Sequence, residues 1–255
     1  MKFYQILTIV SGCLLAAACK KNNSSTSAQD LKDLGLAPGP VAEASDTHAA
    51  NKANQEEAAK KVWPPASDAS AADLMAENFL VVLDDSGSMA GNKMKQAKQA
   101  LKALADTLDK KHQLGLMLLN NRQVIPIASN NRAEFKTAVS RASSDGGTPL
   151  TDATKRAFMQ ITEQASRQQG YGAYHVIVVT DGESNDGSPM EIVQAIVKNT
   201  AVQVHVVGFH VDDHEMNDSR YVNYQTAKNT AELIKAFEAV AAETNEFSDT
   251  KEFTK

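Results

Sequence analysis

Cysteine is scarce in this chain of 255 residues. Only two cysteines are present, Cys13 and Cys19, and both lie within the first twenty residues. Because the rest of the chain has no thiol, it cannot contain a disulfide framework, a Cys-x-x-Cys metal site or a cysteine nucleophile. Catalysis or metal binding in that part of the chain must therefore rely on other side chains.

Aromatic residues and basic charge are also in short supply. Aromatics make up 5% of the residues, with Trp63 as the single tryptophan, so the sequence gives no sign of an aromatic pocket for stacking. The formal net charge is −5 at pH 7, which gives no reason to expect nucleic acid as a partner. Hydrophobic residues reach 42%, enough for a core, and the length allows one large domain or two small ones.

The first nineteen residues have the pattern of a secretory signal. Lys2 precedes a charge-free apolar run of about 16 residues, shorter than the roughly 20 that span a membrane, and small residues follow. The ending Leu15-Ala16-Ala17-Ala18-Cys19 resembles a bacterial lipobox, which implies a lipoprotein signal peptide over residues 1–19 and lipidation of Cys19. Two alternatives stay open: a lipobox ending at Cys13, which leaves only a short apolar segment, and an uncleaved anchor with inert cysteines.

The residues after Cys19 predict where the protein works. Lys20, rather than an acidic residue, follows it; by analogy with lipoproteins we expect a lipid-anchored protein of the cell envelope, on the outer membrane and facing the periplasm or the surface. Residues 20–75 are polar and low in complexity, so we expect a flexible tether with a reach of roughly 40 Å. Within it, Trp63-Pro64-Pro65 is either a stop before the domain or a short docking motif for a partner.

Apolar segments of two periods alternate after about Asp73. Short apolar runs predict strands at residues 79–83, 114–119, 123–128, 175–179, 202–209 and 221–227, and helical spacing predicts helices at 93–110, 133–142, 150–168, 190–198 and 229–244. Pro126 cannot donate to a ladder, so its strand should lie at a sheet edge, antiparallel to its predecessor. The alternation predicts an α/β fold over residues 76–246, with a doubly wound, mostly parallel sheet and helices on both faces, and a polar tail at 247–255.

Three polar segments lie where such a sheet binds ligands, at the carboxyl ends of its strands. They are Asp84-Asp85-Ser86-Gly87-Ser88, Gly146-Gly147-Thr148 and Thr180-Asp181-Gly182-Glu183. Carboxylate and hydroxyl oxygens are hard ligands, which suit Mg²⁺, Ca²⁺ or Mn²⁺ rather than zinc or copper. The candidate metal ligands are therefore Asp84, Ser86, Ser88, Thr148 and Asp181, although each of them alone would also suit a cap or a turn.

The three segments resemble the signatures of a von Willebrand factor A (VWA) domain with a metal-ion-dependent adhesion site (MIDAS). Asp84, Ser86 and Ser88 match its Asp-x-Ser-x-Ser, Thr148 its loop threonine and Asp181 its distal aspartate. The resemblance implies a Rossmann-like VWA fold and one divalent cation, Mg²⁺ first among the candidates, held directly by the hydroxyls and largely through water by the carboxylates. Such an ion is under-neutralised and attracts an outside carboxylate. The segment at residues 210–229 is shorter than usual in the family and lacks an obvious amphipathic helix.

This resemblance predicts a non-enzymatic, lipid-anchored module for adhesion or assembly, which captures an Asp or Glu of a protein partner through the metal. Two other functions stay open. In a Mg²⁺-dependent phosphotransfer enzyme, Asp84 would be the nucleophile, as in haloacid-dehalogenase-like phosphatases, but those carry a second acid where Ser86 stands. In a structural lipoprotein, the metal would only stabilise the fold. A serine hydrolase is disfavoured because no Gly-x-Ser-x-Gly surrounds Ser86 or Ser88.

Two weaker candidate metal sites lie in the loops. Asp181, Glu183 and Asn185 have the spacing of the first ligands of an EF-hand loop, but the glycine and the final glutamate of such a loop are missing. His210 and His214, with two aspartates between them, could form a second metal site, although histidines in a polar loop often have no such role.

Other charged or titratable residues have a plainer interpretation. Arg141, Lys155 and Arg156 flank the Thr148 loop, and they would either orient an acidic ligand or form a solvated helix face. His175 and His205 fall within expected strands, so we interpret them as packing residues.

Overall fold

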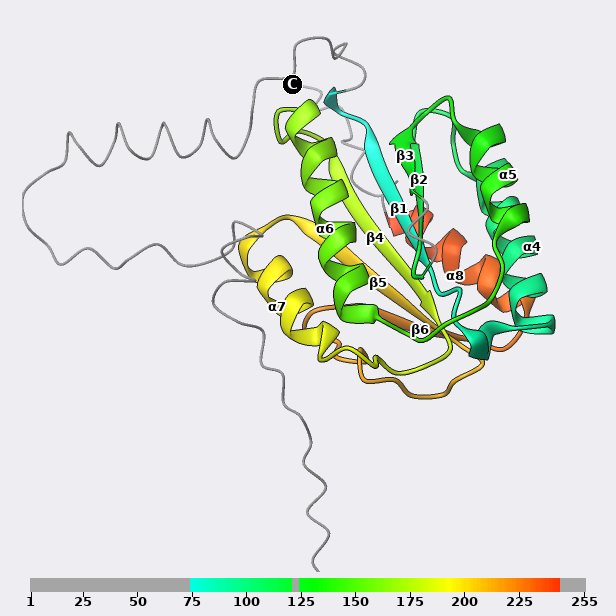
Figure 1. The fold of residues 1–255 in the computed structure, drawn as a ribbon. Helices are drawn as coiled ribbons and strands as arrows, with labels where there is room; N and C mark the ends of the chain where they lie inside the picture. The colour runs from blue at the N-terminus through cyan, green and yellow to red at the C-terminus, as the bar shows by residue number, and fades with distance from the viewer. Residues whose placement is uncertain (1–73, 121–123, 244–255) are drawn as a thin grey trace, which may run out of the picture.

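Six strands form one sheet at the centre of the molecule (Figure 1). The computed structural model describes residues 74–120 and 124–243. Its strands are β1 (Glu77–Leu83), β2 (Gln113–Leu118), β3 (Val124–Ala128), β4 (Ala173–Thr180), β5 (Val202–Phe209) and β6 (Asn223–Ala227). They lie in the order β3-β2-β1-β4-β5-β6, and all neighbours run parallel except β2 and β3, which are antiparallel.

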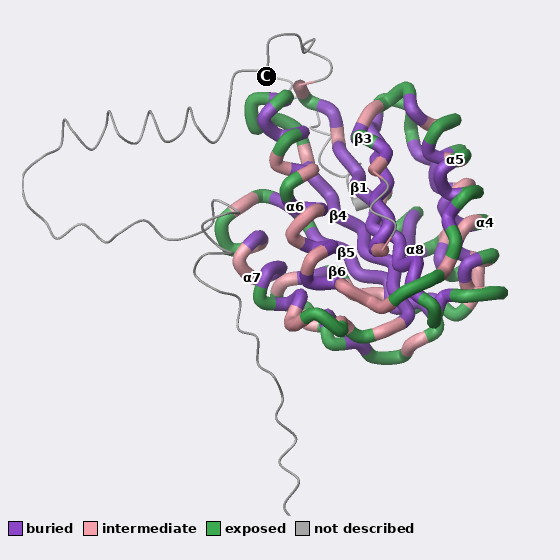
Figure 2. The backbone as a smooth tube through the Cα atoms, in the orientation of Figure 1, coloured by how far each residue is buried: buried purple, intermediate pink, exposed green. Residues whose placement is uncertain are grey.

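Helices cover both faces of the sheet (Figure 1). α4 (Asn92–Thr107), α5 (Arg132–Arg141) and α8 (Thr230–Glu243) pack on one face, and α6 (Leu150–Arg167) and α7 (Pro189–Asn199) pack on the other. Because side chains alternate along a strand, β1 contributes to an apolar core on each face of the sheet. Val81 lies in the core under α4, α5 and α8, and Leu80 lies in the core under α6 and α7. Figure 2 shows the central strands buried along most of their length and the outer faces of the helices exposed.

The predicted fold class is confirmed: the sheet is mostly parallel, has one antiparallel edge strand and is covered by helices on both faces. Pro126 lies in that edge strand, β3, where its missing N–H breaks no central ladder. The opposite edge is β6, which begins at Asn223, two residues later than predicted. Residues 210–222, before it, form bends and turns without a helix. At the start of α8, the Asn229 side chain donates to Glu232 Oε1 at 2.6 Å and accepts from the Glu232 N–H at 3.0 Å, which is an N-terminal cap.

The expected signal peptide, Cys19, the Trp63-Pro64-Pro65 segment and the rest of the expected tether up to residue 73 lie outside the described residues, as do residues 244–255, which include the expected polar tail. Within the described ranges, none of the helices combines the length and the apolarity needed to cross a membrane. The described residues therefore cover the α/β domain that carries all three polar segments.

The chain changes direction across the sheet between β1 and β4. From β1 it passes through α4 to β2 and β3 on one side, and then through α5 and α6 to β4 on the other. Loops diverge at such a switch point and leave a crevice at the carboxyl ends of the two central strands. Asp84 follows β1 and Asp181 follows β4, so the topology brings these two carboxylates to the same edge of the sheet.

Candidate metal centre

Asp84 directly follows the buried strand β1 and is itself fully buried. Its Oδ1 accepts a hydrogen bond from the Ser86 N–H at 2.8 Å, and its Oδ2 accepts one from the Thr180 hydroxyl at 2.6 Å. Burial raises the pKa of the Asp84 carboxyl above its usual value; the hydrogen bonds from Ser86 and Thr180 oppose this rise, and the Asp181 charge adds to it. A cation brought close to Asp84 would therefore stabilise its ionised form.

Ser86, Ser88 and Asp181 form a chain of contacts beside Asp84. Ser86 Oγ lies 3.0 Å from Ser88 Oγ, and the Ser88 hydroxyl donates to Asp181 Oδ1 at 2.7 Å. The two serines can meet because Ser86 is extended, with φ −66° and ψ 166°, before the single 3₁₀ turn at Gly87–Met89. The structure thus brings together residues from the loops after β1 and β4, as predicted.

Lys93 reaches the same cluster from the first turn of α4. Its Nζ donates to Asp181 Oδ2 at 2.5 Å, so the two Asp181 oxygens are divided between Ser88 and Lys93. The Asp181 side chain has no solvent exposure, whereas the Lys93 side chain is 33% exposed. No sequence pattern indicates this contact, because a lysine early in an amphipathic helix is usually solvated.

Thr148 joins the cluster from the loop before α6. A Cβ placed on Gly182 would lie 3.6 Å from Thr148 Oγ1 and 3.7 Å from Ser88 Oγ, so both hydroxyls lie beside this glycine. The Asn185 N–H donates to the Thr148 carbonyl at 3.0 Å, and the Asn185 side-chain amide accepts from the Thr148 N–H at 3.1 Å. A Cβ at Gly147 would lie 2.1 Å from the end of that amide, so this contact requires glycine.

Hydrogen bonds between backbones hold the site loops together. The Gly87 N–H donates to the Gly146 carbonyl at 3.0 Å, and Gly146 has a φ of +78°, which favours glycine. Asn120 completes the link: its N–H donates to Asp85 Oδ1 at 2.6 Å, and its side chain donates to the Gly147 carbonyl at 2.7 Å. Asp85 and Asn120 therefore position the loops, a role that sequence reasoning missed.

The segment between β5 and β6 also reaches the site. The His214 Nε2–H donates to the Gly182 carbonyl at 2.6 Å, and His214 Nδ1 accepts from the Met216 N–H at 3.1 Å. These two bonds fix the tautomer and leave no ring nitrogen for a metal. His210 contacts Gln96 instead. The second metal site suggested by the two histidines does not form; His214 positions the Gly182 loop.

The other weak candidates also have structural roles. Asp186 accepts from the N–H groups of Thr151 and Asp152, at 2.9 and 2.8 Å, and so caps the start of α6 rather than completing an EF-hand-like loop. Arg156 donates to Asp152 at 2.8 Å and to the Leu119 carbonyl at 2.7 Å. It ties α6 to the end of the β2 region, which contradicts a free role in orienting a ligand.

The chemistry of the cluster fits a hard divalent cation. The described residues contain no group of three or more His, Cys, Asp or Glu side chains suited to a metal. Hydroxyls would therefore have to join the two carboxylates, and such an all-oxygen set suits Mg²⁺, Ca²⁺ or Mn²⁺. The Lys93 ammonium on Asp181 is a cation already held by this cluster. The same oxygens can thus stabilise positive charge at this place.

Residues 78–251 match the von Willebrand factor type A domain family. An uncharacterised protein of Synechocystis sp. is 27% identical over 146 residues, which cover 55% of this chain and 33% of that protein. The von Willebrand factor domain of the type V pili tip protein Mfa5 from Porphyromonas gingivalis has a TM-score of 0.57 at 12% identity, over 71% of this chain and 98% of that one. Proximal thread matrix protein 1 from the mussel byssus, in a structure with a zinc-occupied MIDAS motif, has a TM-score of 0.51 at 19% identity. The match covers 68% of this chain and 47% of that protein's chain.

At these identities the two solved structures show a shared fold. The chain spans about a third of the length of its Synechocystis relative, so the properties of that whole protein do not transfer. The family match covers more than half of the chain and includes all three polar segments at the sheet edge. The chain therefore belongs to the von Willebrand factor type A domain family.

Proposed function

We propose that this protein is a divalent-metal-dependent binding module that captures a carboxylate of a protein partner. The ion, with Mg²⁺ expected and Ca²⁺ or Mn²⁺ as alternatives, would be held by Asp84, Ser86, Ser88, Thr148 and Asp181. The observation that carries the proposal is the convergence of three hydroxyls and two carboxylates at one sheet edge. Hydroxyls are neutral ligands, so an ion that they hold directly keeps positive charge for an outside anion.

Binding agrees with what this family does. VWA domains typically mediate protein–protein interaction and adhesion. The nucleophile of the phosphotransfer alternative, Asp84, is fully buried and has hydrogen bonds on both carboxylate oxygens, which does not suit attack on a phosphoryl group. A serine nucleophile needs a positioned base, and His214 is committed to the Gly182 carbonyl. The geometry therefore favours capture of a ligand over bond breaking.

The same proposal includes an anchor at the envelope. Lipid on Cys19 would hold the chain to the outer membrane, and residues 20–75 would let the domain reach a partner in the periplasm or at the surface. The support is the lipobox-like sequence and the polar composition of the tether. Metabolic labelling with a fatty acid, in the wild type and in a Cys19→Ala variant, tests the anchor separately from the metal.

Titration calorimetry of the full-length chain with MgCl₂ tests the metal step. Thr148→Ala removes one hydroxyl, and Asp84→Asn removes one charge but keeps an acceptor for the Ser86 N–H. Each should weaken Mg²⁺ binding at least tenfold and leave a folded domain, because Thr148 lies in a half-buried loop and asparagine has nearly the same shape as the buried aspartate that it replaces. Thr137→Ala, on the exposed face of α5, is the matched control. Unchanged Mg²⁺ affinity in both site variants would refute the assignment.

Capture of envelope proteins on the immobilised chain, with and without EDTA, tests the binding step. Loss of the captured partner in EDTA with little change in melting temperature supports the binding module. A large fall in melting temperature with no partner found supports the structural lipoprotein instead. Phosphate release that Asp84→Asn abolishes would establish the phosphotransfer alternative.

A further inference from the structure

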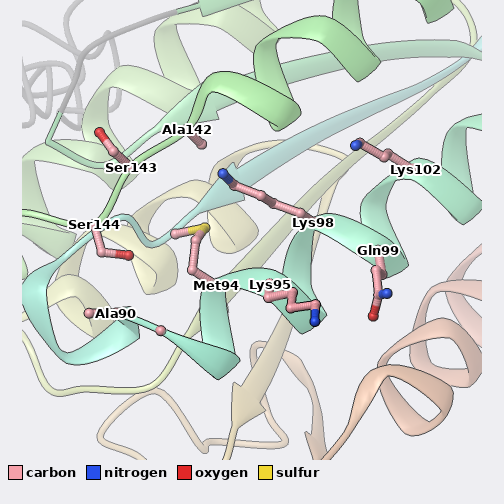
Figure 3. Close-up of a pocket in the computed structure, with 10 residues that line it drawn as sticks. Ala90, Met94, Lys95, Lys98, Gln99, Lys102, Ala142, Ser143 and Ser144 are labelled. Atoms are coloured by element: carbon pink, nitrogen blue, oxygen red, sulfur yellow. The ribbon is translucent and has the colours of Figure 1, made fainter.

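An open groove of about 560 Å³ runs along α4 beside the candidate metal site (Figure 3). Its second wall is the end of α5 and the residues that follow it, including Ser143. Three lysines of α4 line the groove, Lys95, Lys98 and Lys102, and every other lining residue is uncharged. The volume lies in the range of ordinary ligand clefts.

The positive charge of this groove is not compensated. The three lysines are spaced i, i+3 and i+7 on α4, so their side chains share one side of the helix. Within the described ranges none of them forms an ion pair. Lys98 donates to the Ser140 carbonyl at 3.0 Å, and in Figure 3 its side chain points toward Ala142 on the other wall. Burial, and then the charge of Lys102, lower the pKa of Lys98. The repulsion would be relieved by an anion.

The groove is continuous with the site loops. Ala90 and Gly91, at one end of the groove, follow the turn that carries Ser88. Ser143 and Ser144, on the other wall, precede Asp145, whose N–H donates to the carbonyl of Asp85 at 2.8 Å. A peptide with one side chain at the candidate metal site therefore has a direct path over the lysines.

We infer that the groove binds an acidic segment of the protein partner whose carboxylate occupies the metal site, an inference that rests on the proposed function. The three lysines span roughly 10 Å of helix. In an extended peptide, side chains on one face recur about every 6.6 Å, so two or three acidic residues match this span. The chain as a whole carries 31 acidic and 26 basic residues, so a wholly basic groove departs from its general surface charge.

Other polyanions fit the groove less well. Its cations are lysines, which lack the planar fork that arginine offers to phosphate groups. No aromatic side chain lines it, so nucleic-acid bases have nothing to stack on. An acidic peptide, held by single charges, is the occupant that these features favour.

Fluorescence anisotropy with a fluorescein-labelled hexaglutamate peptide tests the inference on the full-length chain, with hexaglutamine as the uncharged probe. The groove variant carries Lys95→Gln, Lys98→Gln and Lys102→Gln. The control variant, with the same net charge, removes three exposed lysines elsewhere: Lys110→Gln, Lys198→Gln and Lys235→Gln. We expect the groove variant to bind hexaglutamate about tenfold more weakly and the control to stay within twofold of wild type, with equal melting temperatures.

Measurements in MgCl₂ and in EDTA separate this inference from the proposed function. Hexaglutamate binding that persists in EDTA and is lost in the groove variant supports the groove, even if the metal proposal fails. Equal binding by the groove and control variants overturns the groove, whatever the metal does. Lysine-dependent binding that is tighter for oligothymidylate or for phosphatidylserine vesicles than for hexaglutamate overturns the acidic peptide as occupant.

Discussion

Replacement of Lys93 by methionine should make the metal-free protein less stable and its Mg²⁺ binding tighter. Lys93 Nζ lies 2.5 Å from Asp181 Oδ2, and the Asp181 side chain has no solvent exposure. Lys93 therefore neutralises a buried charge for which the proposed divalent ion would compete. Methionine keeps most of the apolar stem and removes the ammonium, so the change isolates the charge.

The free energy of the Lys93–Asp181 ion pair follows from Coulomb's law, reduced for screening by solvent. Two unit charges about 4 Å apart near a protein surface interact by about 4 kcal/mol. Because the Lys93 side chain is 33% exposed, screening and desolvation reduce the net contribution to about 1–2 kcal/mol. Loss of this competitor should tighten Mg²⁺ binding by roughly 5- to 30-fold. The melting temperature in EDTA should fall by a few degrees, because Asp181 is left buried without a counter-charge.

Titration calorimetry with MgCl₂ and thermal melts in EDTA measure the two halves of this prediction. Lys95→Met is the control, because Lys95 is an exposed lysine of the same helix without an ion pair among the described residues. Excess Mg²⁺ should restore the melting temperature of Lys93→Met. Unchanged or weaker Mg²⁺ binding in Lys93→Met would refute the competition and indicate that the ammonium supports the metal-bound form.

Two further predictions concern buried groups. His175 Nδ1 lies 3.2 Å from His205 Nε2. Burial lowers the pKa of His175 from 6.5 to about 3 and the pKa of His205 from 6.5 to about 4. Below pH 6.5 the two histidines are therefore protonated in the unfolded chain but stay neutral in the folded chain. The free energy of unfolding should fall by about 2 kcal/mol per histidine between pH 7.5 and pH 5. Equal midpoints of urea unfolding at the two pH values would contradict this prediction. Gly147→Ala should displace the Asn185 amide and with it Thr148, so calorimetry should show weaker Mg²⁺ binding in a protein that still folds; wild-type affinity would show that the loop tolerates the methyl group.

The sheet was predictable because its strands are buried on both faces. Such strands contain uninterrupted apolar runs, as in residues 79–83 and 176–179, and they are readily distinguished from the helical pattern around them. Pro126 indicated an edge strand because proline has no N–H to donate to a neighbouring strand, and a sheet accommodates it mainly at an edge. The start of β6 was less predictable, since its edge position leaves an intermediate, half-exposed pattern.

The candidate site was predictable only in part. Asp84, Thr148 and Asp181 follow from the rule that ligands gather where the strands end, together with the family resemblance. Lys93 and His214 did not, because their contacts to Asp181 and to the Gly182 carbonyl join segments that are remote in sequence. A lysine or a histidine in a polar setting has the same local pattern whether it is solvated or holds a loop. Only the tertiary arrangement distinguishes the two.

The site loops are joined through their backbones, from Gly87 to Gly146 and from Asn185 to Thr148. Contacts of this kind do not depend on the side chains that the loops present to solvent. Exposed neighbours such as Ser143 can therefore be exchanged during evolution without loosening the frame beneath them. One frame for the proposed ion can in this way be reused under many recognition surfaces, and a change of partner would then require substitutions at the rim alone.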